Sequence, residues 1–133
     1  MKEVLTIQVT THEVEAVANS EREARMVFFG GYAACPSFHG EILSGGVDTQ
    51  LREGAIVTLS ARYLLSGCDA TGAPCRIFIE NNGILAPAAP DTPVTTTPRI
   101  ITDSSALRFL ETAALTGTVV PAGETQVTIH IFV

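Results

Sequence analysis

Tryptophan is absent from the 133 residues, and basic side chains are scarce, with eight Lys and Arg against fourteen Asp and Glu. The net charge is −6, and no stretch collects the Lys or Arg needed to neutralise phosphates. We therefore expect neither nucleic acid nor an anionic membrane as a partner. No apolar run approaches the ~20 residues of a membrane span. The first residues also lack the longer apolar run of a secretory signal, so we expect a cytoplasmic protein.

Cysteines are few and odd in number: Cys35, Cys68 and Cys75. In a cytoplasmic protein we expect reduced thiols. Cys68 and Cys75 flank residues 69–74 almost symmetrically, which leaves a disulfide across a hairpin as an alternative. No CxxC or Cys/His spacing of a zinc site is present, and we expect no metal. The sequence also lacks a phosphate loop and a GxSxG motif, and we expect no cofactor.

The chain has the usual length of one domain and can bury roughly two-thirds of its unfolded surface. We therefore expect residues 1–133 to form a single domain. Alternation of apolar and polar side chains predicts strands, because successive side chains in a strand point to opposite faces. The predicted strands cover residues 4–10, 26–29, 37–43, 55–65, 76–82, 94–101 and 125–133.

Residues 55–65 form the longest predicted strand. Its apolar row, from Val57 to Leu65, alternates with a polar row that includes Arg62, and one row must face the inside of the protein. Residues 76–82 are predicted to be its hairpin partner across a turn containing Asp69 and Gly72. A register symmetric about that turn places Leu64 opposite Phe78, Arg62 opposite Glu80 and Ser60 opposite Asn82.

Six to nine short strands with few helical segments predict an all-β sandwich or barrel. We favour a small antiparallel barrel, closed or nearly closed, because closure hides sheet edges. Residues 20–25 fit either a helical turn or a hairpin arm. Residues 86–93, with three prolines, predict an irregular surface loop. Residues 104–114 are helical or turn-rich, so at most one short helix is expected.

Several segments resemble a known family, the bacterial and fungal β-barrels called domain of unknown function 3237 or uncharacterised protein family 0311. They are FGG (29–31), HGEILSGGVDTQ (39–50), LSARYLL (59–65), ENNG (80–83) and TTPRI (96–100). Asp48, Gln50, Arg62 and Tyr63 match family positions, whereas Thr49 stands where the family usually has Trp. Leu107, Phe109, Leu110 and Glu111 replace its Tyr-x-Trp-Leu-Asn pattern. The resemblance implies a lipocalin-like barrel with a cavity inside it or at its mouth.

Asp48 and Gln50 lie two residues apart and, in an extended segment, point the same way, so they can present an acceptor and an amide to one ligand. The alternative is a turn in which Asp48 binds nearby backbone amides. Arg62 offers a fork of donors to a carboxylate or enolate, and the alternative is an ion pair with Glu80. Tyr63 is a candidate general acid, or a buried packing residue with one satisfied hydroxyl.

Other candidates for ligand binding are less constrained by the sequence. His39 and Glu41 share one strand face and fit either an acid/base dyad or an exposed pair. Tyr32 offers a second phenolic proton. Glu80, Asn81, Arg99 and Phe109 complete the set of candidate ligand-binding residues.

The predicted function is a cofactor-independent enzyme that acts on a small organic molecule in the barrel cavity by proton transfer, as an isomerase, cyclase or lyase. Asp48, Arg62 and Tyr63 are the predicted catalytic residues. The alternative is a non-catalytic protein that binds a hydrophobic small molecule in the same cavity. Homo-oligomerisation through an apolar strand face is compatible with either function.

Overall fold

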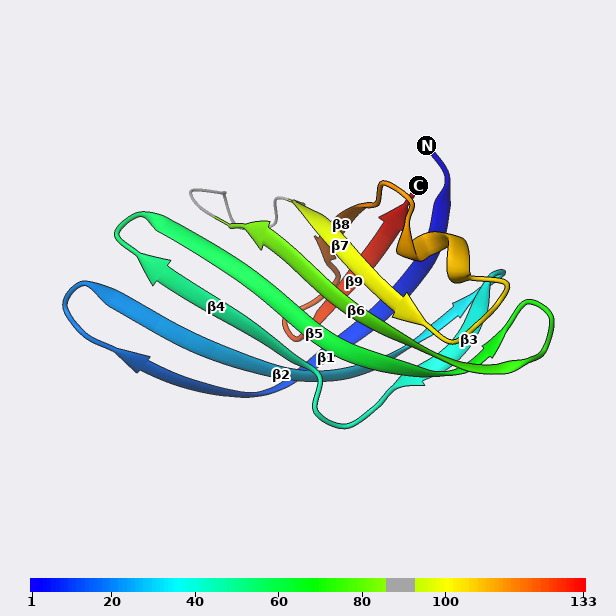
Figure 1. Ribbon diagram of the computed structural model, residues 1–133. Coiled ribbons are helices and arrows are strands. Elements are labelled where there is room, and N and C mark those ends of the chain that lie inside the picture. The colour runs from blue at the N-terminus through cyan, green and yellow to red at the C-terminus, as the bar shows by residue number, and fades with distance from the viewer. Residues whose placement is uncertain (86–92) are drawn as a thin grey trace.

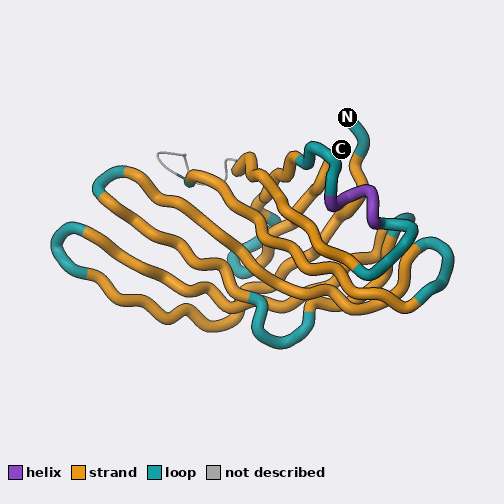
Figure 2. The backbone as a smooth tube through the Cα atoms, viewed as in Figure 1, coloured by secondary structure: helices purple, strands orange, loops and turns teal. Residues whose placement is uncertain are grey.

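The computed structural model describes residues 1–85 and 93–133. Most of the predicted surface loop, residues 86–92, lies outside the described residues. The described part of the chain contains nine strands and one short 3-10 helix. Figure 1 follows them from the N-terminus to the C-terminus, and Figure 2 colours strands, helix and loops separately. The elements are β1 (Glu3–Ala18), β2 (Arg22–Cys35), β3 (Phe38–Ile42), β4 (Val47–Glu53), β5 (Ile56–Asp69), β6 (Pro74–Ile84), β7 (Val94–Thr102), η1 (Arg108–Glu111), β8 (Thr116–Pro121) and β9 (Gln126–Phe132).

The strands form one antiparallel sheet that curls into a nearly closed ring. The order is β1-β9-β8-β7-β6-β5-β3-β2-β4, and further pairings of β1 with β2 and β4 with β5 bring the ends together. β3 and β4 occupy successive stretches between β2 and β5. The weakest seam is between β7 and β8, where only residues 94–96 pair with residues 117–119. The predicted small antiparallel barrel is confirmed.

The predicted register of the β5–β6 hairpin is also confirmed. Arg62 lies opposite Glu80, Leu64 opposite Phe78 and Ser60 opposite Asn82. Asp69 closes the turn between the two strands, because one of its carboxylate oxygens accepts hydrogen bonds from the backbone N–H groups of residues 71 and 73. The apolar row of β5 faces the interior, so the polar row that contains Arg62 faces outward.

The structure extends the sequence prediction in two places. The charged residues 20–25 belong to the β1–β2 hairpin, in which Asn19 Oδ1 accepts hydrogen bonds from the backbone N–H groups of Glu21 and Arg22. Strands β4 and β8 were not predicted. The inward positions of β4 carry Asp48, Gln50 and Arg52 in place of apolar side chains, and β8 is only 6 residues long.

One end of the barrel is filled with apolar side chains, and we call it the filled end. Leu5, Leu65 and Ile77 are 0% exposed there. η1 packs against β7, and Leu107 and Leu110 from this segment are buried in the same core. At the other end, the β1–β2 and β4–β5 hairpins reach beyond the remaining strands (Figure 1). No helix in the residues described is long and apolar enough to cross a membrane.

The cysteines are free, and the alternative of a hairpin disulfide does not hold. Cys68 lies opposite Pro74, and Cys75 lies opposite Gly67. The side chains of Cys68 and Cys75 therefore point to opposite faces of the sheet, so that Cys68 is exposed and Cys75 is buried. A disulfide between them would require one of the two side chains to move to the other face of the sheet.

Candidate functional site

A cavity of about 390 Å³ occupies the barrel interior on the side of the long hairpins, and we call this half the cavity end. Its walls are mostly apolar, and few polar side chains interrupt them. Small-molecule sites commonly combine an apolar lining with a few placed polar groups. The lining residues are Val9, Thr11, Val27, Phe29, Asp48, Gln50, Leu59, Ala61, Asn81, Leu85, Val94, Val119, Pro121, Val127 and Ile129.

The cavity exists because small residues occupy inward positions where the filled end has Leu and Ile. The strand pairing places Asp48, Ala61 and Asn81 in one row across β4, β5 and β6. The methyl group of Ala61 leaves space between the two polar side chains. In the neighbouring row, Gly83 and Gly117 bring no side chain at all.

The two carboxylate oxygens of Asp48 differ in their hydrogen bonding. Gln50 Nε2 donates a hydrogen bond of 2.9 Å to Asp48 Oδ2. Asp48 Oδ1 is buried and has no hydrogen-bond partner among residues 1–85 and 93–133. Burial raises the pKa of Asp48 above its ordinary value, although the Gln50 hydrogen bond, the backbone N–H of Ser60 and the charge of Arg25 act against this rise. A carboxylate in this setting is a stronger base than one in water.

Asn81 and Thr96 form a second polar group in the interior. They are 1% and 3% exposed, and within the described chain neither Asn81 Oδ1 nor Thr96 Oγ1 has a hydrogen-bond partner. The two oxygens converge on Gly117. A Cβ at Gly117 would collide with Thr96 Oγ1 and lie 3.5 Å from Asn81 Oδ1. Asn81 lines the cavity as predicted, whereas Thr96 was not predicted.

Tyr63 lies in the core next to the cavity and does not line it. It is the next inward-facing residue of β5 after Ala61, and its ring packs edge-on against the cavity residue Phe29 at a centroid distance of 5.2 Å. Its hydroxyl is buried without a partner in the described part of the protein. Burial raises the pKa of Tyr63, so the phenol keeps its proton at neutral pH.

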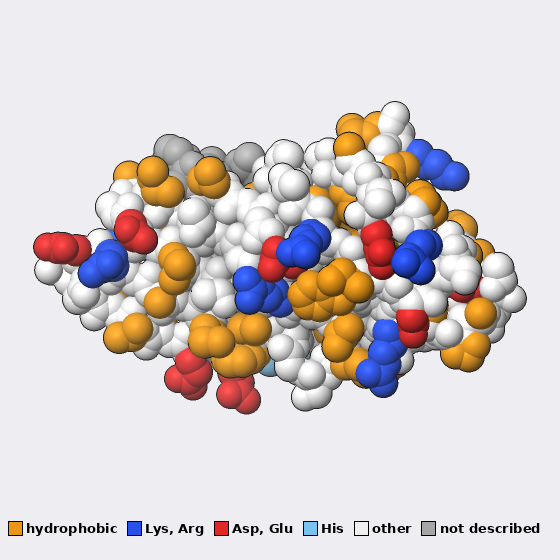
Figure 3. All heavy atoms as spheres, in the orientation of Figure 1, with side chains coloured by type: hydrophobic (Ala, Val, Ile, Leu, Met, Phe, Trp, Pro, Cys, Tyr) orange, Lys and Arg blue, Asp and Glu red, His pale blue; other side chains and the backbone are white. Residues whose placement is uncertain are grey.

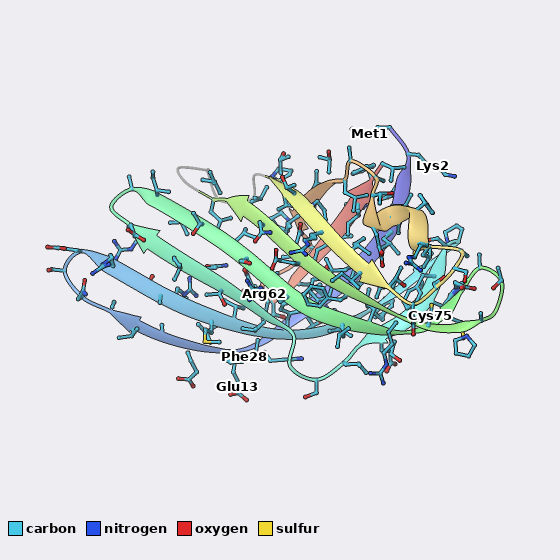
Figure 4. All side chains as sticks on the ribbon, viewed as in Figure 1. Met1, Lys2, Glu13, Phe28, Arg62 and Cys75 are labelled. Atoms are coloured by element: carbon cyan, nitrogen blue, oxygen red, sulfur yellow. The ribbon has the colours of Figure 1, made fainter. Side chains whose placement is uncertain are left out.

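The structure corrects the hypothesis that Arg62 binds a ligand in the cavity. Arg62 lies on the outer face at the middle of β5, and its side chain is 65% exposed (Figure 4). Its Nε lies 3.1 Å from Glu80 Oε2, so the alternative of an ion pair holds. Arg99 lies opposite Glu80 and extends the same outer row. The face in Figure 3 shows basic and acidic side chains interspersed around a hydrophobic patch.

The remaining candidates also lie away from the cavity. Tyr32 and Glu41 are paired across β2 and β3 on the outer face, and both are exposed. His39 shares that face with Glu41, as the alternation predicts, but no hydrogen bond joins the two side chains in the described residues. Phe109 lies half-exposed on η1 at the filled end. These four positions do not join Asp48 in one site.

Arg25 is a residue of the site that the sequence analysis missed. It lies opposite Gln50 and alternates with Val27 and Phe29, which line the cavity. Its charge acts on Asp48. The signal was available in this alternation, but only once β2 is known to begin as early as Arg22. Residues 1–85 and 93–133 contain no group of three or more His, Cys, Asp or Glu side chains placed to hold a metal ion.

Solved structures with the same fold come from bacteria and a fungus. A protein of unknown function from Clostridium acetobutylicum superimposes with a TM-score of 0.81 at 21% identity, covering 98% of this chain and 93% of its own. A β-barrel-like protein from Acinetobacter baumannii AYE gives 0.75 at 18% identity, with 98% and 92% covered. A structure described as an enzyme from Penicillium herquei gives 0.66 at 19% identity, with 98% and 92% covered.

These likenesses concern the fold, because all three identities are below 25%. No curated protein matches the chain. A family model matches at the level of sequence and covers residues 1–133. The chain therefore belongs to the family described as protein of unknown function DUF3237.

Proposed function

We propose that this protein is a cofactor-independent enzyme that moves a proton on a small organic molecule held in the cavity, with Asp48 as the general base and acid. One observation carries the proposal: Asp48 lines a mostly apolar cavity, and one of its carboxylate oxygens is buried without a hydrogen-bond partner among the described residues. Burial that raises the pKa of a carboxyl group is a common way to fit it for proton transfer near neutral pH. One structural relative is described as an enzyme, which agrees with this proposal.

The proton transfer is balanced without an electron acceptor. The Asp48 carboxylate takes a proton from the carbon that lies between a substrate carbonyl and a C=C bond, and the electron pair of that C–H bond forms a dienolate. Protonated Asp48 then returns the proton to the far end of the dienolate, the γ carbon, which shifts the C=C bond into conjugation with the carbonyl and completes an isomerisation. Gln50 holds Asp48 in place through Oδ2 and leaves Oδ1 for the substrate. Gln50 also lines the cavity, and the N–H of its amide that Asp48 does not use can donate a hydrogen bond to the enolate oxygen.

A non-catalytic binding protein is the second candidate. The apolar majority of the cavity lining favours it, because such a lining alone suffices to hold a hydrophobic molecule. The two functions differ in what they require of Asp48. A binding protein needs at most its polarity, whereas an enzyme needs its ability to exchange a proton.

Hydrogen–deuterium exchange separates the two. A panel of enolisable cyclic ketones is incubated with the protein in D₂O, and NMR follows deuterium uptake at carbon. The wild type is expected to accelerate uptake for at least one ketone, and Asp48→Asn should lower that rate at least ~100-fold. Glu41→Gln is the matched control, because it makes the same chemical change on the exposed outer face.

Ligand binding is measured on the same variants by thermal shift, since a bound ligand stabilises the folded state. If Asp48→Asn binds the ketone and exchanges it as fast as wild type does, the proton-transfer proposal fails. If the wild type stabilises on binding but no ketone exchanges faster than in buffer, the binding-protein alternative is favoured.

A further inference from the structure

The cavity has two polar poles, and Ala61 stands between them. Asp48 and Gln50 form the first pole on β4. Asn81 on β6, which lines the cavity, forms the second together with Thr96 on β7, whose hydroxyl lies near the Asn81 amide at Gly117 and does not itself line the cavity. Neighbouring strands lie ~4.8 Å apart, so the backbones of Asp48 and Asn81, two strands apart, are separated by ~10 Å. Both side chains project into the same interior, and the space between the poles is apolar.

The second pole is built to receive an oxygen function of a ligand. Its two oxygens are nearly inaccessible to solvent and lack partners within residues 1–85 and 93–133. A buried polar atom without a partner destabilises the folded protein, and a ligand that supplies the partner removes that cost. The absence of a side chain at Gly117 lets Thr96 Oγ1 pack directly against this residue, since a Cβ there would collide with it.

We propose that the cavity takes a compact, uncharged, mostly apolar molecule with two oxygen functions, hydroxyl or carbonyl, one at each pole. This inference rests on the proposed function for the role of Asp48, and it adds the Asn81–Thr96 pole as the group that determines substrate specificity. Asp48 and Gln50 hold the reacting oxygen function and its adjacent carbon. Asn81 and Thr96 hold the distant one and so fix the orientation of the molecule.

Size and charge narrow the class of ligand. The cavity volume of about 390 Å³ corresponds to ~13 water molecules at ~30 Å³ each, which suits a body of about a dozen non-hydrogen atoms. No Lys or Arg is among the described residues that line the cavity. The Asp48 carboxylate would repel a second anion in this apolar space. Arg25, whose charge acts on the site, is already opposed by the Asp48 carboxylate, so an uncharged hydroxyl or carbonyl group fits this lining better than a free carboxylate does.

Three probes of the same shape test the two poles: naphthalene, 2-naphthol and naphthalene-2,6-diol. Their dissociation constants are measured by isothermal titration calorimetry on the whole chain. The diol should bind at least tenfold more tightly than 2-naphthol, and 2-naphthol more tightly than naphthalene. Thr96→Val removes a hydroxyl at nearly constant volume and should weaken diol binding about fivefold, with no change for naphthalene. Thr97→Val is the matched control, because Thr97 is exposed on the outer face of the same strand.

Equal affinities for naphthalene and the diol would overturn the inference, and so would equal effects of Thr96→Val and Thr97→Val on diol binding. A second readout does not depend on any variant: the amide signal of Gly117 should shift on adding the diol and stay in place on adding naphthalene. The diol-binding result can be told apart from the ketone-exchange result that tests the proposed function. If Asp48 does not promote exchange of ketones and the diol still binds through Thr96, only the catalytic proposal fails.

Discussion

At the filled end of the barrel, Ser104 Oγ donates a hydrogen bond of 2.6 Å to Asp69 Oδ2 and accepts one from the backbone N–H of Leu107. Thr102 Oγ1 donates to the backbone carbonyl of Arg76 and accepts from the N–H of Ser104. At the cavity end, Asp48, Asn81 and Thr96 each keep a buried oxygen for which the described residues provide no partner. Ser60 Oγ and Tyr63 Oη, in the middle of β5, also lack partners among the described residues. The polar network at the filled end is thus satisfied, whereas the unsatisfied groups lie at the cavity end and in the middle of β5.

The difference between the two ends indicates that the filled end stabilises the fold, whereas the cavity end is the candidate for function. Buried polar groups are nearly always hydrogen-bonded, and each exception calls for an explanation such as a catalytic role, an ordered water or a bound molecule. The filled end can be understood from the chain alone, because its core is apolar and its polar network is closed. The cavity end lacks both properties. The unsatisfied oxygens at three inward-facing positions of β4, β6 and β7 are the reason why we place the proposed site there.

The largest expected effect on stability comes from replacing a leucine by alanine at each end of the barrel, in two separate variants. Leu65 and Leu59 lie on the same face of β5, 0% and 7% exposed, one in the filled core and one on the cavity wall. Leu65→Ala should lower the free energy of unfolding by about 2–5 kcal/mol, because it opens a void in a packed core. Leu59→Ala enlarges a space that already exists and should cost about 1–2 kcal/mol. Urea denaturation of both variants measures the difference, and equal losses would show that the two halves are packed alike.

A smaller effect with the opposite sign is expected at Asp48. Its pKa in the folded protein is raised above the ordinary value of 3.8, so protonation favours the folded state. Its contribution to stability is therefore fully present below about pH 3.8 and is lost as the pH rises through the folded pKa. Asp48→Asn should raise the melting temperature at pH 7, and this advantage should vanish below pH 3.8. A variant less stable than wild type at pH 7 would argue against burial of the charged carboxylate.

Asp69 at the filled end provides the contrasting pH dependence. Hydrogen bonds from Ser104 and Thr71 lower the pKa of Asp69 below its ordinary value. Its stabilising contribution is present above about pH 3.8 and is lost as the pH falls through the folded pKa. Asp69→Asn should therefore destabilise the protein at pH 7 and flatten its acid unfolding. Melting temperatures between pH 7 and pH 2 for both Asn variants test the two signs together.

Much of the fold could be predicted because its signals are local. The β5–β6 register follows from a turn with Asp69 and Gly72 between two strands of matching alternation. β4 escaped prediction because polar side chains stand on its inward face, where alternation would place apolar ones. That departure is itself the mark of the site, since Asp48 and Gln50 are the residues that break the pattern.

The site could be predicted only in part because alternation assigns residues to two faces without placing the strands around a common interior. Asp48, Gln50 and Asn81 were predicted, and the structure brings them to one cavity. Arg25 was missed because its nearness to Gln50 depends on the pairing of β2 with β4, which β3 separates in the sequence. Thr96 was missed because the sequence between β6 and β7 does not set the register of that pair. The candidates Arg62 and Arg99 lie on the outer face, where charged side chains remain hydrated.

The smallest expected effect concerns Arg62 and tests which face of β5 is functional. An exposed ion pair contributes about 0–1 kcal/mol, so Arg62→Ala should change the free energy of unfolding by less than about 1 kcal/mol. Because the side chain of Arg62 lies on the outer face of β5 and the cavity lies on the inner face, Arg62→Ala should bind naphthalene-2,6-diol with wild-type affinity. Thr96→Val should bind the diol more weakly. Urea denaturation and calorimetry on these two variants provide the comparison. A tenfold loss of diol affinity in Arg62→Ala would mean that the outer row takes part in binding, and the division between a functional interior and a hydrated exterior would then be wrong.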